Sequence, residues 1–299
     1  MRLQYYIEYG FMKAVVLFVS LFPWSWNRKL AYTLLPLMYV IGNYRRLTEA
    51  NIKASSLDIP KTGKPLKRFI REVFIQNIIT YIEMMKLMTM KREAVMKHFR
   101  FADVNVLRKT YETGKGAIFV LGHIGNWEIL GQATAYSGFP LYAVARRQNN
   151  PLTDEMLNTM RRKSGFKVIF REGNSAMEII RALHEKAGVA MLNDQDGGLS
   201  GVTTRFMGRM CSTPQGPVVI GLKTGVPVLF VYTVRDENGD HVAYVGEPEV
   251  LTRRHPDLET DIREHLQKLV DKLEAVVAQY PTQWNWLANR WRTKRNATV

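Results

Sequence analysis

Short apolar runs alternate with helical patterns from about residue 115 onward, and this alternation restricts the fold more than any other feature of the chain. Runs rich in β-branched and aromatic residues are typical of buried strands, and apolar residues at spacings of three and four are typical of helices. Short connections between such elements predict an α/β domain, with helices flanking a mostly parallel mixed sheet. The expected strands are 116–122, 140–146, 167–171, 188–194, 226–234 and 241–250, and the expected helices are 126–137, 154–164, 175–185 and 257–280.

Two turn-forming segments refine this expectation. The last two strands flank the residues RDENGD, whose Asn-Gly pair is typical of a β-hairpin turn. The segment STPQGPVVIGLKTG begins at Ser212 and predicts a further helix, with Ser212 or Thr213 as the N-cap and Pro214 in the first turn.

The N-terminal part of the chain has a different character. It contains two apolar runs, Ala14–Trp26 and Leu30–Tyr44, and a proline interrupts each of them. A membrane-spanning helix needs about 20 apolar residues, so each run is short for a span. The flanking Lys, Arg, Trp and Tyr residues favour helices that lie at a membrane interface, although two buried core helices would show the same apolar runs. We therefore divide the chain into membrane-associating helices at 1–50 and an α/β domain at 51–299.

The net charge of +15 is concentrated in the first part of the chain. Residues 1–115 carry 20 Lys and Arg against 8 Asp and Glu. A local basic field indicates an anionic partner, which can be a nucleic acid, an acidic protein or an anionic membrane surface. No helix-turn-helix, zinc-finger or RNA-binding motif is present, and the basic residues are interleaved with apolar runs. We therefore expect no nucleic acid, whereas an anionic membrane surface and an acidic protein both fit the basic charge.

The segment GAIFVLGHIGNWE, which begins at Gly116, carries the clearest candidate for catalysis. Ligands of α/β sheets bind beyond the carboxyl ends of the strands, where His123 is expected. Asn126 can cap the next helix, which places Glu128 in the first helical turn. Glu128 is then expected to accept a hydrogen bond from one imidazole nitrogen and to leave the other as a general base. Because the chain has no Gly-x-Ser-x-Gly motif, the pair is expected to deprotonate a substrate hydroxyl that attacks an activated carbonyl.

The other acidic and thiol groups do not indicate a metal or a cofactor. The single Cys211 excludes a disulfide within the chain and a zinc site with several cysteines. Asp194, Asp196 and His184 have no diagnostic ligand spacing. We therefore expect no metal and no cofactor.

Four blocks, in order, resemble one family. His-x4-Glu at a strand end is similar to the motif of the glycerolipid acyltransferase superfamily, and HIGNWE resembles its bacterial branch, the lipid A biosynthesis lauroyl and myristoyl acyltransferases. The blocks at Ala145–Arg171, Leu192–Val228 and Tyr280–Trp291 are similar to later blocks of that branch. The chain differs from the family's terminal block at Ala288 and Asn289, where the family usually has His and Arg.

The resemblance implies roles for seven residues. His123 would be the general base and Glu128 its orienting partner. Three arginines would face the anionic parts of the acceptor or the developing oxyanion, and an Asp-Gln pair would lie beside the same cleft. These five further residues are Arg146, Arg161, Arg171, Asp194 and Gln195.

The resemblance also implies an activity and a location. The enzyme would move a fatty acyl chain from a thioester, with acyl carrier protein or acyl-CoA as donor, to a hydroxyl or amine of a lipid acceptor. That acceptor would be a membrane glycolipid such as a lipid A precursor, and a phosphatidylinositol mannoside or an amino-acid lipid are alternatives. A catalytically silent lipid-binding relative is a further alternative. The expected location is the cytoplasmic face of the bacterial inner membrane.

Overall fold

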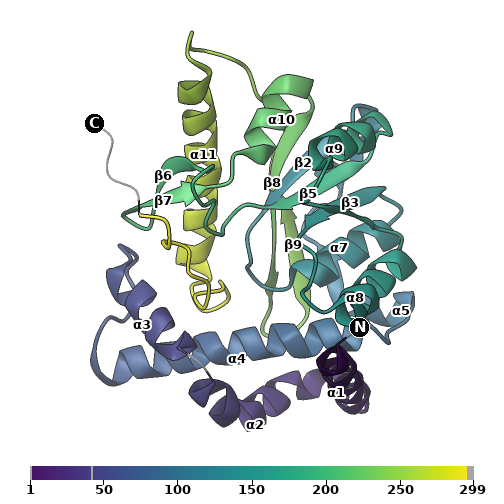
Figure 1. Ribbon diagram of the computed structural model, residues 1–299, viewed down its shortest axis with the longest axis vertical. Coiled ribbons are helices and arrows are strands. Elements are labelled where there is room, and N and C mark those ends of the chain that lie inside the picture. The colour runs from purple at the N-terminus through teal and green to yellow at the C-terminus, as the bar shows by residue number, and fades with distance from the viewer. Residues whose placement is uncertain (1, 42, 295–299) are drawn as a thin grey trace.

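A mixed, mostly parallel sheet with helices on both faces forms the centre of the molecule (Figure 1). The computed structural model describes residues 2–41 and 43–294. The strands are β1 Phe99–Phe101, β2 Ala117–Leu121, β3 Leu141–Ala145, β4 Lys167–Phe170, β5 Gly188–Leu192, β6 Val202–Phe206, β7 Arg209–Thr213, β8 Pro227–Arg235, β9 His241–Val245 and β10 Glu249–Val250. The α-helices are α1 Leu3–Ser20, α2 Asn27–Val40, α3 Tyr44–Ala54, α4 Gly63–Leu87, α5 Arg92–Lys97, α6 Asn105–Glu112, α7 Trp127–Tyr136, α8 Pro151–Ser164, α9 Ser175–His184, α10 Gly216–Thr224 and α11 Leu258–Gln279.

The strand order confirms the predicted fold class. Within the described residues, the large sheet has the order β1-β9-β8-β2-β5-β3-β4, and β10 also pairs with β8. The central strands β8, β2, β5, β3 and β4 are all parallel, whereas β9 and β10 are antiparallel to β8. In the parallel part, the carboxyl ends of neighbouring strands meet at one edge of the sheet, which is where ligands bind in α/β folds.

Both faces of the sheet are buried, as β2 shows. Its residues alternate between two apolar clusters, because successive side chains of a strand point to opposite faces. Ile118 and Val120 belong to the cluster that includes side chains from α4, α9, α10 and α11. Phe119 and Leu121 belong to the cluster formed with α5, α6, α7 and α8. A strand covered on both faces needs a continuous apolar sequence, which is what AIFVL provides.

Most predicted strands and helices are present, with three differences at their boundaries. Helix α8 begins at Pro151 rather than at Asp154, because the Asn150 side chain caps it by accepting a hydrogen bond from the Leu152 backbone N–H at 3.0 Å. The predicted strand 241–250 is two short strands, β9 and β10, that both pair with β8. Pro248 lies in the gap between them, where the absence of a backbone N–H is compatible with an interrupted ladder.

The predicted N-cap at Ser212 or Thr213 is wrong. Both residues end strand β7, which pairs with β6 in a two-stranded antiparallel ribbon, and both are buried. Helix α10 begins later, at Gly216, with Gln215 at the N-cap position and a proline in its first turn. Local sequence preferences favoured a cap here, but pairing with the β6 strand determines the backbone of these residues.

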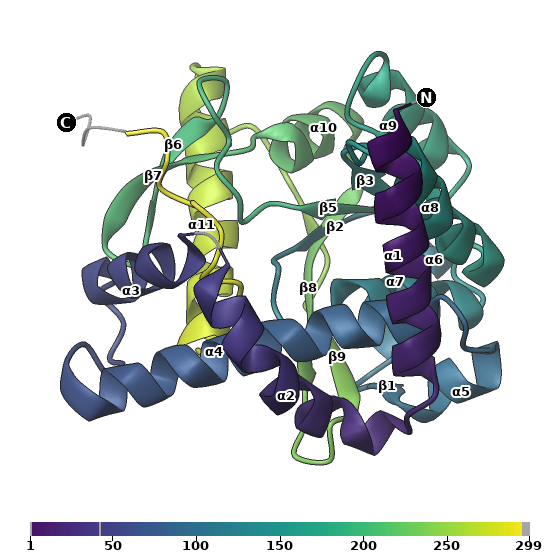
Figure 2. The same cartoon turned by 60° about the horizontal axis from the view of Figure 1, so that its bottom comes forward.

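The N-terminal helices lie along one side of the domain. Helices α1 and α2 pack against α4, the longest helix, and α3 runs across the expected boundary at residue 50 (Figure 2). Buried residues of α2 and α3, such as Ala31 and Ile52, belong to the same apolar cluster as α4 and the sheet. Over the described residues, no single helix has both the length and the apolar composition for a span. The segments Leu3–Ser20 and Trp24–Val40 meet that criterion only as a pair, with a bend of 109° between them.

Candidate active site

The turn between β2 and α7 presents His123 at the carboxyl end of the sheet. Gly125 adopts a φ of +60°, and a Cβ atom at this position would lie 2.1 Å from the carbonyl oxygen of Thr233, so only glycine fits. Asn126 caps α7, as predicted, by accepting hydrogen bonds from the backbone N–H groups of Glu128 and Ile129 at 3.0 and 3.2 Å. The conformation of Gly125 and the Asn126 cap therefore hold the turn, and they fix the backbone position of His123.

Asp194 is the carboxylate that pairs with His123. The Oδ1 atom of Asp194 lies 2.6 Å from Nδ1 of the imidazole, and Oδ2 accepts the backbone N–H of His123 at 2.7 Å. Asp194 is buried at the end of β5. Burial raises its pKa, but the charge interaction and hydrogen bonds with His123, together with the Trp284 indole N–H, outweigh burial and lower the pKa below its usual value.

The second imidazole nitrogen is on the cleft side of His123. With Nδ1 donating to Asp194, the neutral imidazole has Nε2 as its acceptor. The side-chain nitrogen of Gln195 lies 3.3 Å from Nε2, and the Trp127 ring packs edge-on against the imidazole at 4.6 Å between ring centroids. This arrangement holds a base whose tautomer is set by a buried carboxylate.

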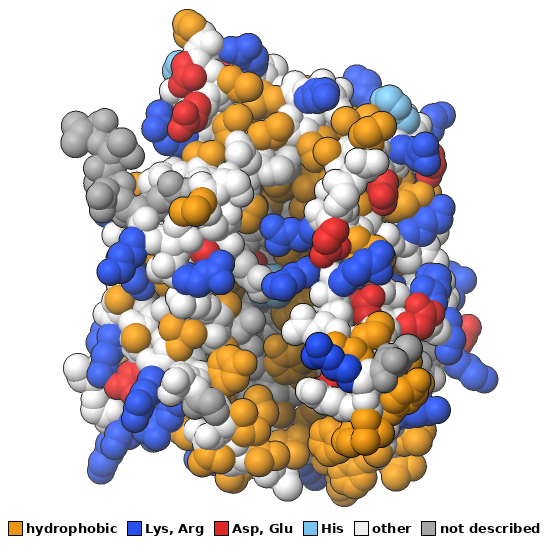
Figure 3. Space-filling view, in the orientation of Figure 1, with side chains coloured by type: hydrophobic (Ala, Val, Ile, Leu, Met, Phe, Trp, Pro, Cys, Tyr) orange, Lys and Arg blue, Asp and Glu red, His pale blue; other side chains and the backbone are white. Residues whose placement is uncertain are grey.

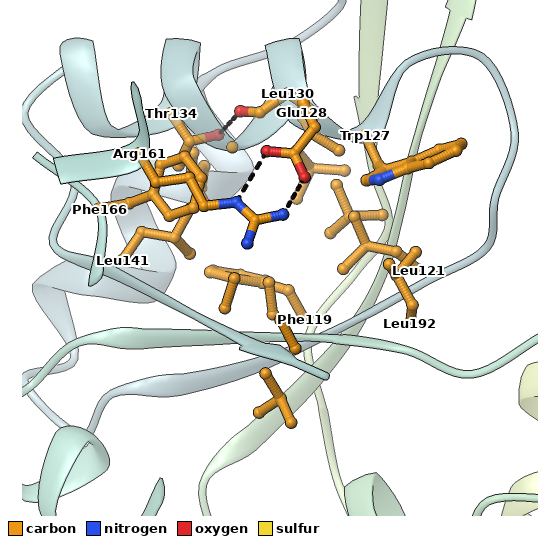
Figure 4. A pocket seen from close by; sticks show the side chains of 18 of the residues that line it. Phe119, Leu121, Trp127, Glu128, Leu130, Thr134, Leu141, Arg161, Phe166 and Leu192 are labelled. Carbon is orange, nitrogen blue, oxygen red and sulfur yellow. Dashed lines mark hydrogen bonds and ion pairs between the residues drawn. The ribbon is translucent and has the colours of Figure 1, made fainter. Parts of the chain in front are cut away.

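Glu128 has a different partner from the one predicted. Its carboxylate forms a two-pronged ion pair with Arg161 of α8, which donates from Nε to Oε2 at 3.1 Å and from Nη2 to Oε1 (Figure 4). Both side chains are buried. The prediction that Glu128 orients His123 is therefore wrong, since Asp194 occupies that position at Nδ1.

The remaining predicted residues lie around one cleft. Arg146, Arg171 and Gln195 line a cavity of about 750 Å³ together with His123. Arg161 also borders this cavity, although its guanidinium is committed to Glu128. In Figure 3 a hollow in the middle of the molecule has Lys and Arg side chains beside it. The cleft is therefore suited to an anionic group close to the imidazole.

A second, apolar cavity of about 90 Å³ adjoins the cleft. It lies between α7, α8 and the sheet, and Figure 4 shows apolar side chains directed into it around the Glu128–Arg161 pair. The two cavities share several lining residues, which are Trp127, Glu128, Val144, Ala145, Arg161 and Leu192. A ligand that extends from the cleft into this space passes from polar to apolar surroundings.

No group of three or more His, Cys, Asp and Glu side chains within residues 2–41 and 43–294 is placed to hold a metal ion. Asp196 accepts hydrogen bonds from the Arg292 guanidinium at 3.1 Å and from the Thr293 hydroxyl at 2.9 Å. His184 lines a separate hollow together with Lys115 and Lys223. The three residues considered as ligands therefore do not form one site.

A buried polar network lies behind residues 122–126, which form the turn that carries His123 and is called the catalytic turn below for its proposed role. Glu83 of α4 accepts hydrogen bonds from the Asn126 side chain at 3.0 Å and from Arg235 at 2.9 and 2.8 Å, and it lies 3.0 Å from Nε2 of His241. Thr80, one turn earlier in the helix, donates to the Gly125 carbonyl oxygen at 3.0 Å. Helix α4 is thus bonded to both the glycine and the cap of the turn.

Two contributors to the site were not predicted. Trp284 donates its indole N–H to Oδ2 of Asp194 at 2.9 Å. Arg290 is buried and donates to the carbonyl oxygen of Gln195 at 2.9 Å. Both belong to the block YPTQWNWLANRW, whose resemblance to a family block and whose dense tryptophans were the sequence signals that could have indicated a role.

Comparison with known proteins identifies a family and relatives of this chain. The model of the family described as bacterial lipid A biosynthesis acyltransferase matches residues 1–293. A phosphatidylinositol mannoside acyltransferase of Mycolicibacterium smegmatis is 26% identical over 195 residues, which cover 63% of this chain and 61% of the relative. A protein of the same name from Mycobacterium tuberculosis is 24% identical over 184 residues, which cover 60% of this chain and 55% of the relative. The similarity thus spans less than two thirds of each relative's length.

The family match extends over nearly the whole chain, including the N-terminal helices and the tryptophan-rich terminal block. It confirms the resemblance inferred from the four sequence blocks. The chain belongs to the bacterial lipid A biosynthesis acyltransferase family.

Proposed function

We propose that this chain transfers a fatty acyl group from a thioester to a hydroxyl or amine of a membrane glycolipid. The observation that carries the proposal is the position of the His123–Asp194 pair on a cleft that leads from arginines into an apolar cavity. Family membership and the relatives named as acyltransferases support the same chemistry. An amphiphilic substrate with an acyl tail and a polar reacting end fits a polar cleft that leads into an apolar cavity.

The reaction uses His123 as general base. Nε2 removes the proton from the acceptor hydroxyl or amine while that oxygen or nitrogen attacks the thioester carbonyl carbon. The tetrahedral intermediate collapses as the carbon–sulfur bond breaks, and the imidazolium returns its proton to the leaving thiolate. The ester or amide and the free thiol are the products. Asp194 keeps Nδ1 as the donor nitrogen and stabilises the transient imidazolium.

The surroundings of the base suggest where the substrates bind. We assign a short part of the acyl tail to the apolar cavity between α7, α8 and the sheet, because a cavity of about 90 Å³ holds only a few methylene groups. Arg146 and Arg171 line the wider cleft and are suited to phosphate or carboxylate groups of the acceptor or the donor. A glycolipid acceptor agrees with the family and with the printed names of the relatives, since lipid A and phosphatidylinositol mannosides both carry sugar headgroups.

We also propose that the enzyme works at the cytoplasmic face of the bacterial inner membrane. Helices α1 and α2 and the residues next to them expose many large apolar side chains, and Figure 3 shows hydrophobic side chains gathered at the bottom of the molecule, where these helices lie. The exposed residues include Leu3, Tyr6, Ile7, Phe11, Leu17, Phe18, Leu21, Trp26, Leu34, Leu37 and Val40. An apolar surface with neighbouring Lys and Arg is the expected composition for binding an anionic interface.

An assay with defined donors and acceptors tests the activity. The purified protein is incubated with acyl carrier protein or CoA thioesters and with a lipid A precursor or a phosphatidylinositol mannoside, and acylated product is measured by mass spectrometry. We expect His123→Ala to lower the rate at least 100-fold, in the range that general-base catalysis contributes. His98 pairs with Asp240 at 2.7 Å, the same kind of contact, but does not line the cleft, so His98→Ala is the matched control and should keep its activity.

The outcome also separates the alternatives. Turnover with only one donor or one acceptor identifies that substrate. Lipid binding without any product would contradict the proposed activity and would favour the silent lipid-binding alternative. A His123→Ala variant with normal turnover would rule out His123 as the base.

A further inference from the structure

The terminal segment of the described chain crosses the catalytic turn. Ile124 and Trp284 form an isolated antiparallel bridge. On either side of it, the Gly125 N–H donates to the Gln283 carbonyl oxygen at 3.1 Å, and the Asn285 N–H donates to the His123 carbonyl oxygen at 3.0 Å. Backbone hydrogen bonds therefore tie residues 283–285 to His123 and its two successors.

The Trp284 side chain extends this contact to the carboxylate behind the base. Its indole Nε1 donates to Oδ2 of Asp194 at 2.9 Å, and the same oxygen accepts the His123 backbone N–H at 2.7 Å. Oδ1 is the atom that meets Nδ1 of the imidazole. If the carboxylate rotated, the Trp284 and His123 N–H groups would lose their shared acceptor, which is unfavourable because Trp284 and Asp194 are buried.

Packing fixes the direction of the indole N–H. Trp284 is 1% exposed, and its ring packs edge-on against Phe206, Trp286 and Trp291 with centroids 5.4, 4.9 and 6.3 Å away. Edge-to-face arrangements of this kind favour one ring orientation. Because the ring is confined by other aromatic residues, its N–H points steadily at Asp194.

We propose that Trp284 is a positioning residue for the general base. It holds Oδ2 of Asp194 so that Oδ1 faces His123, and thereby fixes the tautomer and the orientation of the imidazole. The inference rests on the proposed function, in which His123 removes the acceptor's proton. Trp284 acts through Asp194 and is not expected to touch either substrate, since neither it nor Asp194 lines the cleft.

A comparison of two tryptophans tests this role. Trp286 is equally buried and also donates its N–H, but to the carbonyl oxygen of Pro281 at 2.6 Å. Trp284→Phe and Trp286→Phe each remove one indole donor from the same aromatic cluster. We expect Trp284→Phe to lower kcat by about 10- to 100-fold with KM nearly unchanged, because small misplacements of a catalytic group have effects of this size. Trp286→Phe should keep kcat within about twofold of the wild type, because its N–H does not reach Asp194.

Magnetic resonance gives a readout that does not depend on turnover. In the protein labelled with ¹⁵N-histidine, the Nδ1–H proton of His123 should give a downfield signal that is absent from His123→Gln. We expect this signal to shift or broaden in Trp284→Phe and to stay in place in Trp286→Phe. A merely structural role for Trp284 would leave both the signal and kcat unchanged.

An isosteric replacement covers the case in which Trp284→Phe does not fold. Incorporation of β-(3-benzothienyl)alanine at position 284 keeps the size of the ring and removes only the N–H donor. Loss of kcat together with a changed His123 signal in this variant supports the proposal, and wild-type values for both overturn it. If the wild-type protein shows no acyl transfer, the proposed function fails. The His123 signal still tests whether Trp284 positions His123 through Asp194.

Discussion

Two buried carboxylates near His123 have different partners and therefore different expected roles. Asp194 accepts hydrogen bonds from His123 in the catalytic turn and from Trp284, which packs behind that turn. Glu128 is paired with Arg161 at the wall of the apolar cavity. Asp194 is suited to setting the tautomer of the His123 imidazole, and Glu128 to maintaining the shape of the apolar cavity.

Neutralising each carboxylate should separate these roles. We expect Asp194→Asn to lower kcat by roughly 1000-fold, because the amide favours the wrong imidazole tautomer and cannot stabilise the imidazolium. Glu128→Gln leaves the Arg161 guanidinium buried without a counter-charge and should lower the free energy of unfolding by about 3 kcal/mol. Urea unfolding and steady-state kinetics measure the two effects. A larger kcat loss in Glu128→Gln, at unchanged stability, would restore Glu128 as the partner of the base.

Most residues of the site were predictable, but Trp284, Arg290 and the pairing of His123 with Asp194 were not. His123 was identified because it follows an apolar strand and Asn126 as a cap, whereas Asp194 and Gln195 were identified only through the family resemblance. Proximity in sequence favoured Glu128 as partner of His123. The true partner is 71 positions away, and it arrives because β2 and β5 are neighbours in register, with Leu121 opposite Leu192. Register between strands is a tertiary property that a single sequence does not display.

Helix α4 connects the N-terminal helices to the catalytic turn. Apolar residues at spacings of three and four recur along this helix, but they do not indicate the role of the charged residue among them. Glu83 is fully buried and joins Asn126 to Arg235 and His241. Such a charge is tolerated only where partners on other elements compensate its desolvation, and those partners come from β8 and β9.

This network should make stability depend on pH. Burial alone would raise the pKa of Glu83, but the charges of Arg235 and His241 lower it from 4.5 to about 2. A carboxylate whose pKa is lowered by folding stabilises the protein fully above about pH 4.5 and progressively less as the pH falls toward 2. We expect the free energy of unfolding, measured in urea, to fall less steeply below pH 4.5 in Glu83→Gln than in the wild type.

A surface carboxylate of the same helix is the control for that experiment. Glu72 pairs with Arg28 at 3.0 Å, and both side chains are partly exposed. Exposed ion pairs contribute little to stability, so Glu72→Gln should retain the wild-type slope. Equal slopes for all three proteins would mean that Glu83 does not carry the acid sensitivity.

At the scale of the whole molecule, exposed apolar side chains gather on one side. Figure 3 shows them at the bottom, where α1 and α2 lie in Figure 1, whereas the N-terminal end of α11 lies at the opposite end. The apolar runs in the sequence predicted helices here. Which face of each helix is exposed depends on how the helix packs against α4. The proposed orientation on a membrane therefore depends on the assembled fold.

Vesicle binding tests this orientation. We expect the wild-type protein to sediment with vesicles that contain anionic lipid, and to bind less at high salt, because the basic residues contribute through a screened attraction. Phe11→Glu with Phe18→Glu places charges on two exposed positions of α1 and should weaken binding at least tenfold. Leu258→Glu, on the exposed start of α11, is the control and should bind normally. Binding that is unaffected by the α1 changes would place the membrane contact elsewhere.

The bridge between Ile124 and Trp284 has a consequence for biosynthesis. Proteins emerge from the ribosome N-terminal end first, so the apolar helices and the His123 turn are made long before residues 283–290. A nascent chain therefore has its exposed apolar helices α1 and α2 while Asp194 still lacks its indole donor and Gln195 lacks Arg290. His123 acquires its final surroundings late in synthesis, so under the proposed function the site would become competent only after the proposed membrane-binding surface has been made.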